Sequence, residues 1–189
     1  LASSYHIRLS QESRAWGLAS VGGKSDPENS RLPSLVRTTG VGGGAVDYDL
    51  DGLPDLIVMS AGGTMLLEDS MPNELMRNLG DQFVHVTDFA GVGDRRFGQG
   101  VAVGDFNEDG FPDLLIGNLF ENSLFINQGD GTFVRQSGGK DWRRSKYTTS
   151  VAIGDVSGDH LPDIIEVNYL DDPNMFEPIR FGADGVPVR

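Results

Sequence analysis

The sequence predicts an all-β fold made of repeated units of four short antiparallel strands, the kind of unit that forms one blade of a β-propeller. An acidic nine-residue motif occurs three times, starting at Asp47, Asp105 and Asp155. These starts lie 58 and 50 residues apart, close to the length of one four-stranded blade. Helix patterns are nearly absent, because the 189 residues include 26 glycines and 9 prolines and no stretch has apolar residues at helical spacing over three turns.

Short apolar runs around each motif indicate where the strands lie. The middle copy is clearest, because a Gly-Asp-Gly turn at residues 129–131 separates its last two strands. Its strands are expected at 100–104, 114–116, 124–126 and 132–135. The first copy repeats this order at 45–46, 56–58, 74–77 and 83–86. The third copy predicts only 150–153 and 164–167 before it becomes irregular, so its outer strands are poorly specified.

The repeats divide the chain into four parts. We expect the outer strand of a preceding blade and a loop in residues 1–38, a first blade in 39–92, a second in 93–142 and a partial third in 143–189. About three blades cannot close a ring, and open sheet edges expose unpaired backbone groups. We therefore expect these blades to belong to a larger propeller, or to be completed by other blades of the same or another chain.

Each motif offers the oxygen atoms that a hard cation of the size of Ca²⁺ requires. Positions 1, 3 and 5 lie on one side of a tight turn, position 7 offers its backbone carbonyl, and position 9 returns a carboxylate from the next strand. The expected ligands of the first loop are Asp47, Asp49, Asp51, Leu53 through its carbonyl, and Asp55. Those of the second loop are Asp105, Asn107, Asp109, Phe111 through its carbonyl, and Asp113. Those of the third loop are Asp155, Ser157, Asp159, Leu161 through its carbonyl, and Asp163.

Differences among the loops predict different affinities for Ca²⁺. Gly52 and Gly110 stand at position 6, where the turn needs a positive φ that glycine adopts without steric cost. The third loop has His160 at that position, and its Ser157 is a weaker ligand than Asp or Asn. We expect up to three bound ions, with an affinity order of first loop ≥ second loop > third loop.

Two other interpretations compete with a calcium-binding blade. Acidic turns rich in Gly and Pro also occur as plain solvated β-turns, but three copies in phase argue against coincidence. An EF-hand shares positions 1, 3 and 5 and needs Glu at position 12, which is Val58, Ile116 and Glu166 in the three loops. The flanking apolar runs also predict strands rather than helices, so we reject the EF-hand.

The middle copy carries a family resemblance. Residues 97–117, which read Phe-Gly-Gln-Gly-Val-Ala-Val-Gly-Asp-Phe-Asn-Glu-Asp-Gly-Phe-Pro-Asp-Leu-Leu-Ile-Gly, closely resemble the FG-GAP repeat, also called the VCBS repeat, of integrin α-subunits and bacterial secreted proteins. Residues 83–92 and 122–133 look more particularly like the subgroup related to cartilage acidic protein and the ASPIC/UnbV proteins. The resemblance implies a β-propeller, usually seven-bladed, with Ca²⁺ between the first two strands of several blades.

Composition limits the partners and the compartment. With 28 acidic and 15 basic residues the formal net charge is −13, which argues against nucleic acid or an anionic membrane surface as the main partner. No apolar run approaches the length of a membrane-spanning helix, so membrane insertion is not expected. Loops with few carboxylates bind only where free Ca²⁺ is high, which favours an extracellular, cell-surface or periplasmic setting.

No catalytic constellation stands out in the sequence. His6, His85 and His160 are far apart, and a Gly-x-Ser-x-Gly nucleophile motif is absent. We therefore expect a non-catalytic binding or scaffolding module, in which structural Ca²⁺ holds the loops and a propeller face binds a protein or glycan, as the integrin-like resemblance to adhesion proteins implies. The alternative is a segment of a Ca²⁺-dependent polysaccharide lyase or hydrolase of propeller fold. A third possibility is a spacer within a large surface protein.

Overall fold

The computed structural model describes residues 42–60, 71–136, 146–171, 180–184 and 186–188. Within these residues the protein is nearly all-β, which confirms the predicted fold class. The helix they contain is a single turn, α2 (Thr87–Ala90), which ends at Gly91 in the left-handed conformation. The strand expected within residues 1–38 lies outside the described residues, as does His6.

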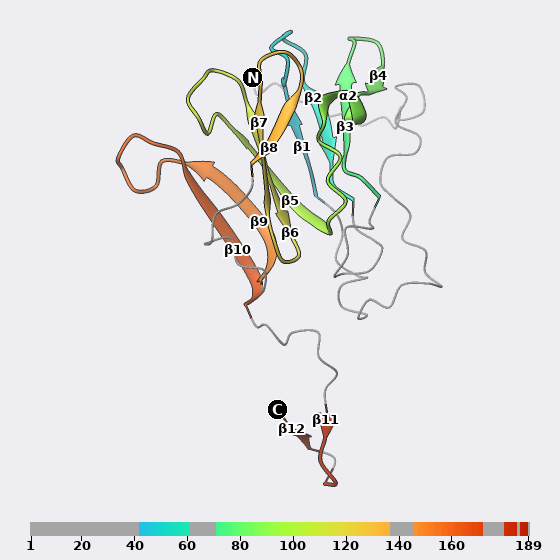
Figure 1. Ribbon diagram of the computed structural model, residues 1–189, viewed down its shortest axis with the longest axis vertical. Helices are drawn as coiled ribbons and strands as arrows, with labels where there is room; N and C mark the ends of the chain where they lie inside the picture. Colours follow the sequence, from blue (N-terminus) through green and yellow to red (C-terminus); the bar gives the residue numbers. More distant parts are fainter. Residues whose placement is uncertain (1–41, 61–70, 137–145, 172–179, 185, 189) are drawn as a thin grey trace, which may run out of the picture.

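Two four-stranded antiparallel sheets follow the strand order that the sequence predicts for a blade (Figure 1). In each sheet every strand pairs with the next strand along the chain. The first sheet contains β1 (Gly43–Val46), β2 (Asp55–Val58), β3 (Glu74–Asn78) and β4 (Phe83–His85). The second sheet contains β5 (Gly98–Gly104), β6 (Asp113–Asn118), β7 (Ser123–Asn127) and β8 (Phe133–Gln136). The described residues show neighbouring blades and not a closed ring.

The third sheet has two strands, β9 (Lys146–Gly154) and β10 (Asp163–Asp171). Both are longer than the sequence predicts, because their pairing continues through register shifts after Val167. Such irregularities leave no clear period in the sequence. In this extension Tyr147 is buried, with its ring edge-on to Tyr169 at 5.9 Å between centroids. A separate short hairpin pairs β11 (Arg180–Phe181) with β12 (Pro187–Val188).

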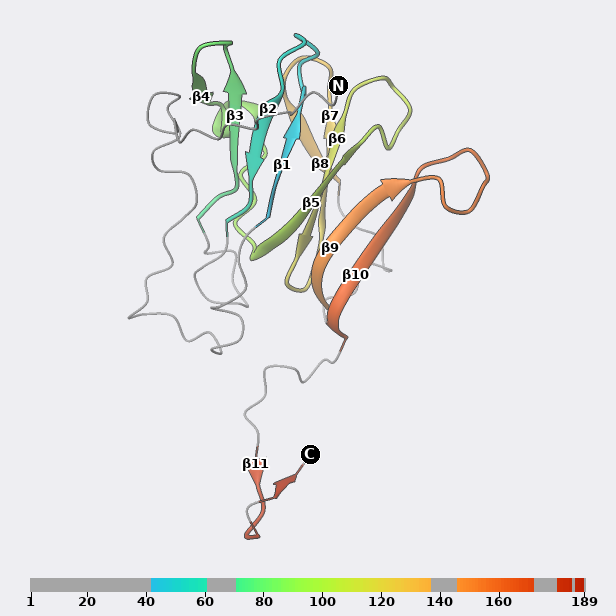
Figure 2. The ribbon, with the colours of Figure 1, turned by 180° about the vertical axis from the view of Figure 1, so that it is seen from behind.

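The first strands of the three sheets lie side by side in the order β1, β5, β9 (Figure 2). Glycines allow this close approach of backbones. A Cβ atom on Gly42 would lie 2.5 Å from the carbonyl oxygen of Gln99, and one on Gly100 would lie 3.0 Å from that of Thr149. Residues larger than glycine would therefore force the inner strands apart.

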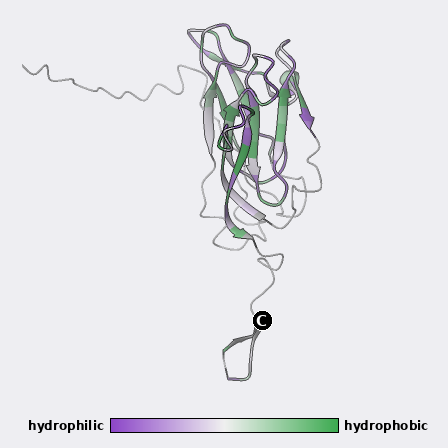
Figure 3. Ribbon diagram, turned by 90° about the vertical axis from the view of Figure 1, so that its left-hand side faces the viewer, coloured by the Kyte–Doolittle hydropathy of each residue, from purple (hydrophilic) through white to green (hydrophobic). Residues whose placement is uncertain are grey.

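The hydrophobic core lies between the sheets. Ile57 of the first sheet clusters with Leu114 and Ile116 of the second, and Leu115 of the second clusters with Val151 of the third. Successive residues of β6 thus face opposite neighbours, as the alternation of side chains along a strand requires. Figure 3 shows hydrophobic residues concentrated in the strands of the stacked sheets. Stacking of the sheets therefore fixes how the loops at the strand ends are positioned.

Candidate metal sites

The acidic motifs connect the first two strands of each sheet and fold alike. In the first loop the carboxylate of Asp47, at position 1, accepts the backbone N–H groups of Asp51 at 3.0 Å and Gly52 at 2.9 Å. The second and third loops repeat both hydrogen bonds onto Asp105 and Asp155. In every loop the carboxylate at position 5 also accepts the N–H group of position 7 at 2.9 Å. The motif therefore builds the same turn three times.

Two positions of each turn have a positive φ. At position 6 the values are 87° for Gly52, 93° for Gly110 and 72° for His160, as the sequence predicts. Position 4 was not anticipated, and its values are 57° for Leu50, 60° for Glu108 and 79° for Gly158. The third loop has exchanged the places of its glycine and its larger residue. Its backbone is thus no more strained than the others, and Ser157 remains the reason to expect weaker binding there.

The carboxylates at position 9 hold the loops to the sheets. In the second loop Asp113 is fully buried and accepts the backbone N–H groups of Phe106 and Asn127, each at 2.8 Å. Asp55 makes the equivalent two hydrogen bonds in the first loop. Asp163 is partly exposed, and its Oδ2 accepts N–H groups from within its own loop only, among the contacts of the described residues.

The carboxyl groups at position 9 differ in pKa. Burial raises the pKa of Asp55 and Asp113 above the ordinary value, and this effect is larger than that of the N–H donors, which lower the pKa. The pKa of Asp163 is lowered, chiefly by the N–H groups of Ser157 and Val156. The same motif position therefore has opposite acid–base properties in the second and third loops.

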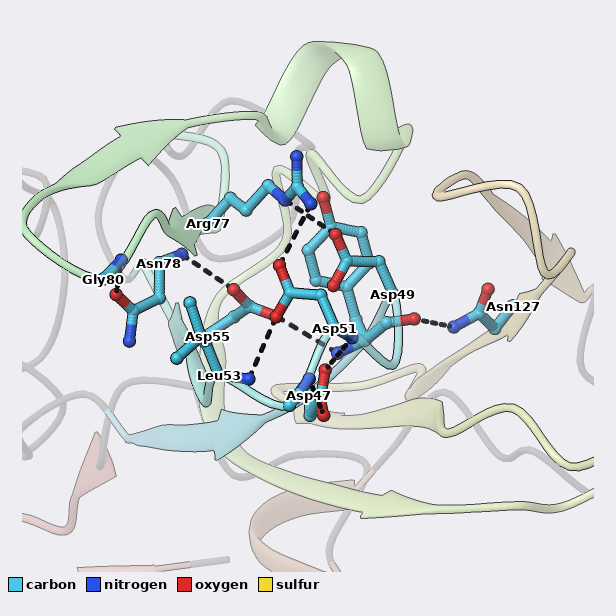
Figure 4. Close-up of polar contacts among 11 residues, drawn as sticks. Asp47, Asp49, Asp51, Leu53, Asp55, Arg77, Asn78, Gly80 and Asn127 are labelled. Atoms are coloured by element: carbon cyan, nitrogen blue, oxygen red, sulfur yellow. Dashed lines mark hydrogen bonds and ion pairs between the residues drawn. The ribbon is translucent and has the colours of Figure 1, made fainter.

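The first loop brings three carboxylates close together (Figure 4). One oxygen atom each from Asp47, Asp49 and Asp55 lies within 4.8 Å of the others, a convergence that no other acidic or imidazole group of the described residues reaches. Oδ1 of Asp49 is buried and has no hydrogen-bond partner. An oxygen-only donor set with an unpaired buried carboxylate oxygen fits Ca²⁺, which prefers six to eight oxygen ligands.

Arg77 of β3 reaches into the first loop, which the sequence did not predict. Its Nε lies 2.6 Å from Oδ2 of Asp49, and its Nη2 lies 3.0 Å from Oδ2 of Asp51. The carboxylate of Asp49 raises the pKa of Arg77, so the guanidinium stays charged. The corresponding residue of the second sheet is Ile126, and this difference between two aligned repeats was the available signal.

Two asparagines support the loops from the third strand of each complete sheet. Asn78 donates through Nδ2 to the carbonyl of Pro54, and Asn127 does the same to Pro112. Asn127 also donates to the carbonyl of Tyr48 at 2.8 Å, which joins the first loop to the second sheet. The recurrent Asn-x-Gly of the aligned repeats was visible in the sequence, but its contact with the neighbouring loop was not.

Part of the chain matches the model of a known protein family. Residues 47–116, from the first loop to the middle of β6, match the model of the FG-GAP-like repeat. This match confirms the FG-GAP resemblance, while the finer subgroup stays a prediction. No curated protein matches the chain. In the part of the chain that the structure describes, no helix has the length and apolar character needed to cross a membrane.

Proposed function

The chain carries an FG-GAP-like repeat, and from this premise we propose that it is a calcium-binding, non-catalytic module whose blades bind a protein or glycan. Bound Ca²⁺ would supply charge neutralisation and cross-linking of the loop oxygens. The protein's own residues fix the shape of the turn, because the carboxylates at positions 1 and 5 accept its backbone N–H groups. The ion is thus proposed as structural.

The convergence of Asp47, Asp49 and Asp55 carries this proposal. Oδ1 of Asp49 would remain a buried acceptor without a partner in the absence of a ligand, which is costly. The equal hydrogen bonding of all three turns supports extending the proposal to the second and third loops, with up to three ions. Since such loops need abundant free Ca²⁺, we place the protein outside the cell, at the cell surface or in the periplasm.

Thermal unfolding tests the calcium proposal. Ca²⁺ at a hundredfold excess over its Kd should stabilise the folded protein by about 2.7 kcal/mol for each occupied site, and chelator should remove this gain. The Asp49→Ala variant should lose the contribution of the first loop. Asp81→Ala removes an exposed carboxylate outside the motifs and should respond to Ca²⁺ like the wild type. An unfolding temperature unmoved by chelator, together with no lanthanide luminescence site, would contradict the proposal.

The non-catalytic role has its own test. Binding to panels of immobilised glycans and extracellular proteins should depend on Ca²⁺ and leave the ligand chemically unchanged. Turnover of acidic polysaccharides that survives Asp109→Ala but disappears on mutation outside the loops would instead identify a lyase or hydrolase.

A further inference from the structure

We propose that Arg77 acts as an internal counter-cation of the first loop and competes with Ca²⁺ there, so that the first loop binds Ca²⁺ more weakly than its carboxylate count predicts. This inference rests on the proposed calcium binding and adds a residue that sets the affinity of one site. It also changes the order expected from ligand types alone, because the second loop becomes the tighter one.

The geometry of Arg77 carries the first step. Its side chain extends from β3 over the loop and contacts two of the predicted ligands, Asp49 and Asp51, through different nitrogen atoms (Figure 4). The two contacts occupy one oxygen of each carboxylate and leave Oδ1 of Asp49 unpaired. A Ca²⁺ ion coordinated by both carboxylates would therefore lie close to the positive guanidinium that they already bind.

Among the described residues, no cation forms an ion pair with the carboxylates of the second loop, which makes it a natural comparison. Ile126 occupies the place of Arg77, one residue before the supporting asparagine of the third strand. Asn107 stands where the first loop has Asp49, and its Nδ2 donates to Oδ2 of Asp109 at 2.8 Å. An amide thus does in the second loop what the guanidinium does in the first. The extra carboxylate and the arginine of the first loop offset each other in charge.

Electrostatics gives the direction of the effect. Ca²⁺ would either share the carboxylates with the guanidinium, at the cost of repulsion between like charges, or displace it and break two ion pairs. An amide at the same place carries no charge and can turn its oxygen toward a cation. Because the side chain of Arg77 is 37% exposed, solvent weakens this competition, and we expect about a tenfold effect on affinity.

Calorimetric titration of Ca²⁺ into matched variants tests the inference. Asp109→Ala with Asp159→Ala isolates the first loop, and adding Arg77→Ile should then tighten binding about tenfold. Arg135→Ile removes an exposed positive charge on β8, beside Gly91 and Arg95, and should leave the affinity unchanged.

The metal-free protein gives a readout that does not depend on affinity. In chelator, Arg77→Ile should lower the unfolding temperature, because Asp49 and Asp51 lose their counter-charge, and Ca²⁺ should restore more stability than in the wild type. The inference would be overturned if Arg77→Ile and Arg135→Ile bound Ca²⁺ at the first loop with equal affinity. If Arg77→Ile does not fold, Arg77→Gln, which keeps much of the aliphatic stem and removes the charge, should tighten binding in its place, and an unchanged affinity in Arg77→Gln would overturn the inference as well. Absence of Ca²⁺ binding at every loop of the wild type would instead refute the proposed function itself.

Discussion

The second and third repeats contain the same motif, yet they place its last carboxylate in different surroundings. Asp113 is fully buried and receives one N–H group from its own loop and one from Asn127 of β7. Asp163 is partly exposed and receives both of its N–H groups from the third loop. The third strand of the second sheet supplies the second donor, and the described residues of the third sheet contain no such strand.

This contrast separates two contributions to the loop. The hydrogen bonds within the turn follow from the motif and are present in both repeats. Burial of the last carboxylate depends on neighbouring strands and is therefore set by the stacking of sheets. Three predictions test how far the two repeats differ, all for the protein in chelator so that metal binding does not contribute.

The largest effect should come from removing the buried carboxylate. Asp113→Ala should destabilise the fold by about 3 kcal/mol, because it leaves the N–H groups of Phe106 and Asn127 buried without acceptors. Asp163→Ala should cost clearly less, since water can reach the N–H groups it exposes. Urea unfolding monitored by circular dichroism measures both losses. Equal losses would show that the third loop is as well covered as the second.

A smaller effect should come from relieving positive φ in the two loops. Glu108→Gly at position 4 of the second loop and His160→Gly at position 6 of the third should each stabilise the protein by up to about 1 kcal/mol. The reciprocal change Gly110→His should destabilise the second loop by a similar amount. Denaturant midpoints of the three variants check this prediction. A gain from His160→Gly without one from Glu108→Gly would show that only position 6 is strained.

The smallest effect should appear in the dependence of stability on pH. Asp113 has a raised pKa in the folded protein, so its contribution to stability is fully present below 3.8 and is lost as the pH rises through the raised value. Asp163 has a lowered pKa, so its contribution is present above 3.8 and is lost as the pH falls through the lowered value. Carboxyl ¹³C titration should place the two midpoints on opposite sides of 3.8. Asp113→Asn and Asp163→Asn should remove the two pH dependences separately.

Much of the fold was readable from the sequence because the signals were local. Apolar runs on either side of each motif predicted the strands of the two complete sheets, and glycine at position 6 predicted the left-handed turn. The extension of β9 and β10 was not readable, since its register shifts have no period. Position 4 was missed because Leu50 and Glu108 are residues that rarely adopt positive φ, and only Gly158 hinted at it.

By itself the sequence determined the turn chemistry of the three loops, because the carboxylate at position 1 of each loop binds an N–H group only four residues away. Only the tertiary structure decided which loop contacts an arginine, which has its last carboxylate buried, and which is hydrogen-bonded to an adjacent sheet. Arg77 reaches the first loop from 26 residues beyond Asp51, and Asn127 reaches Tyr48 across 79 residues. Contacts between distant segments depend on the pairing of strands within a sheet and on the stacking of sheets, and together these give the same nine-residue motif three different electrostatic environments.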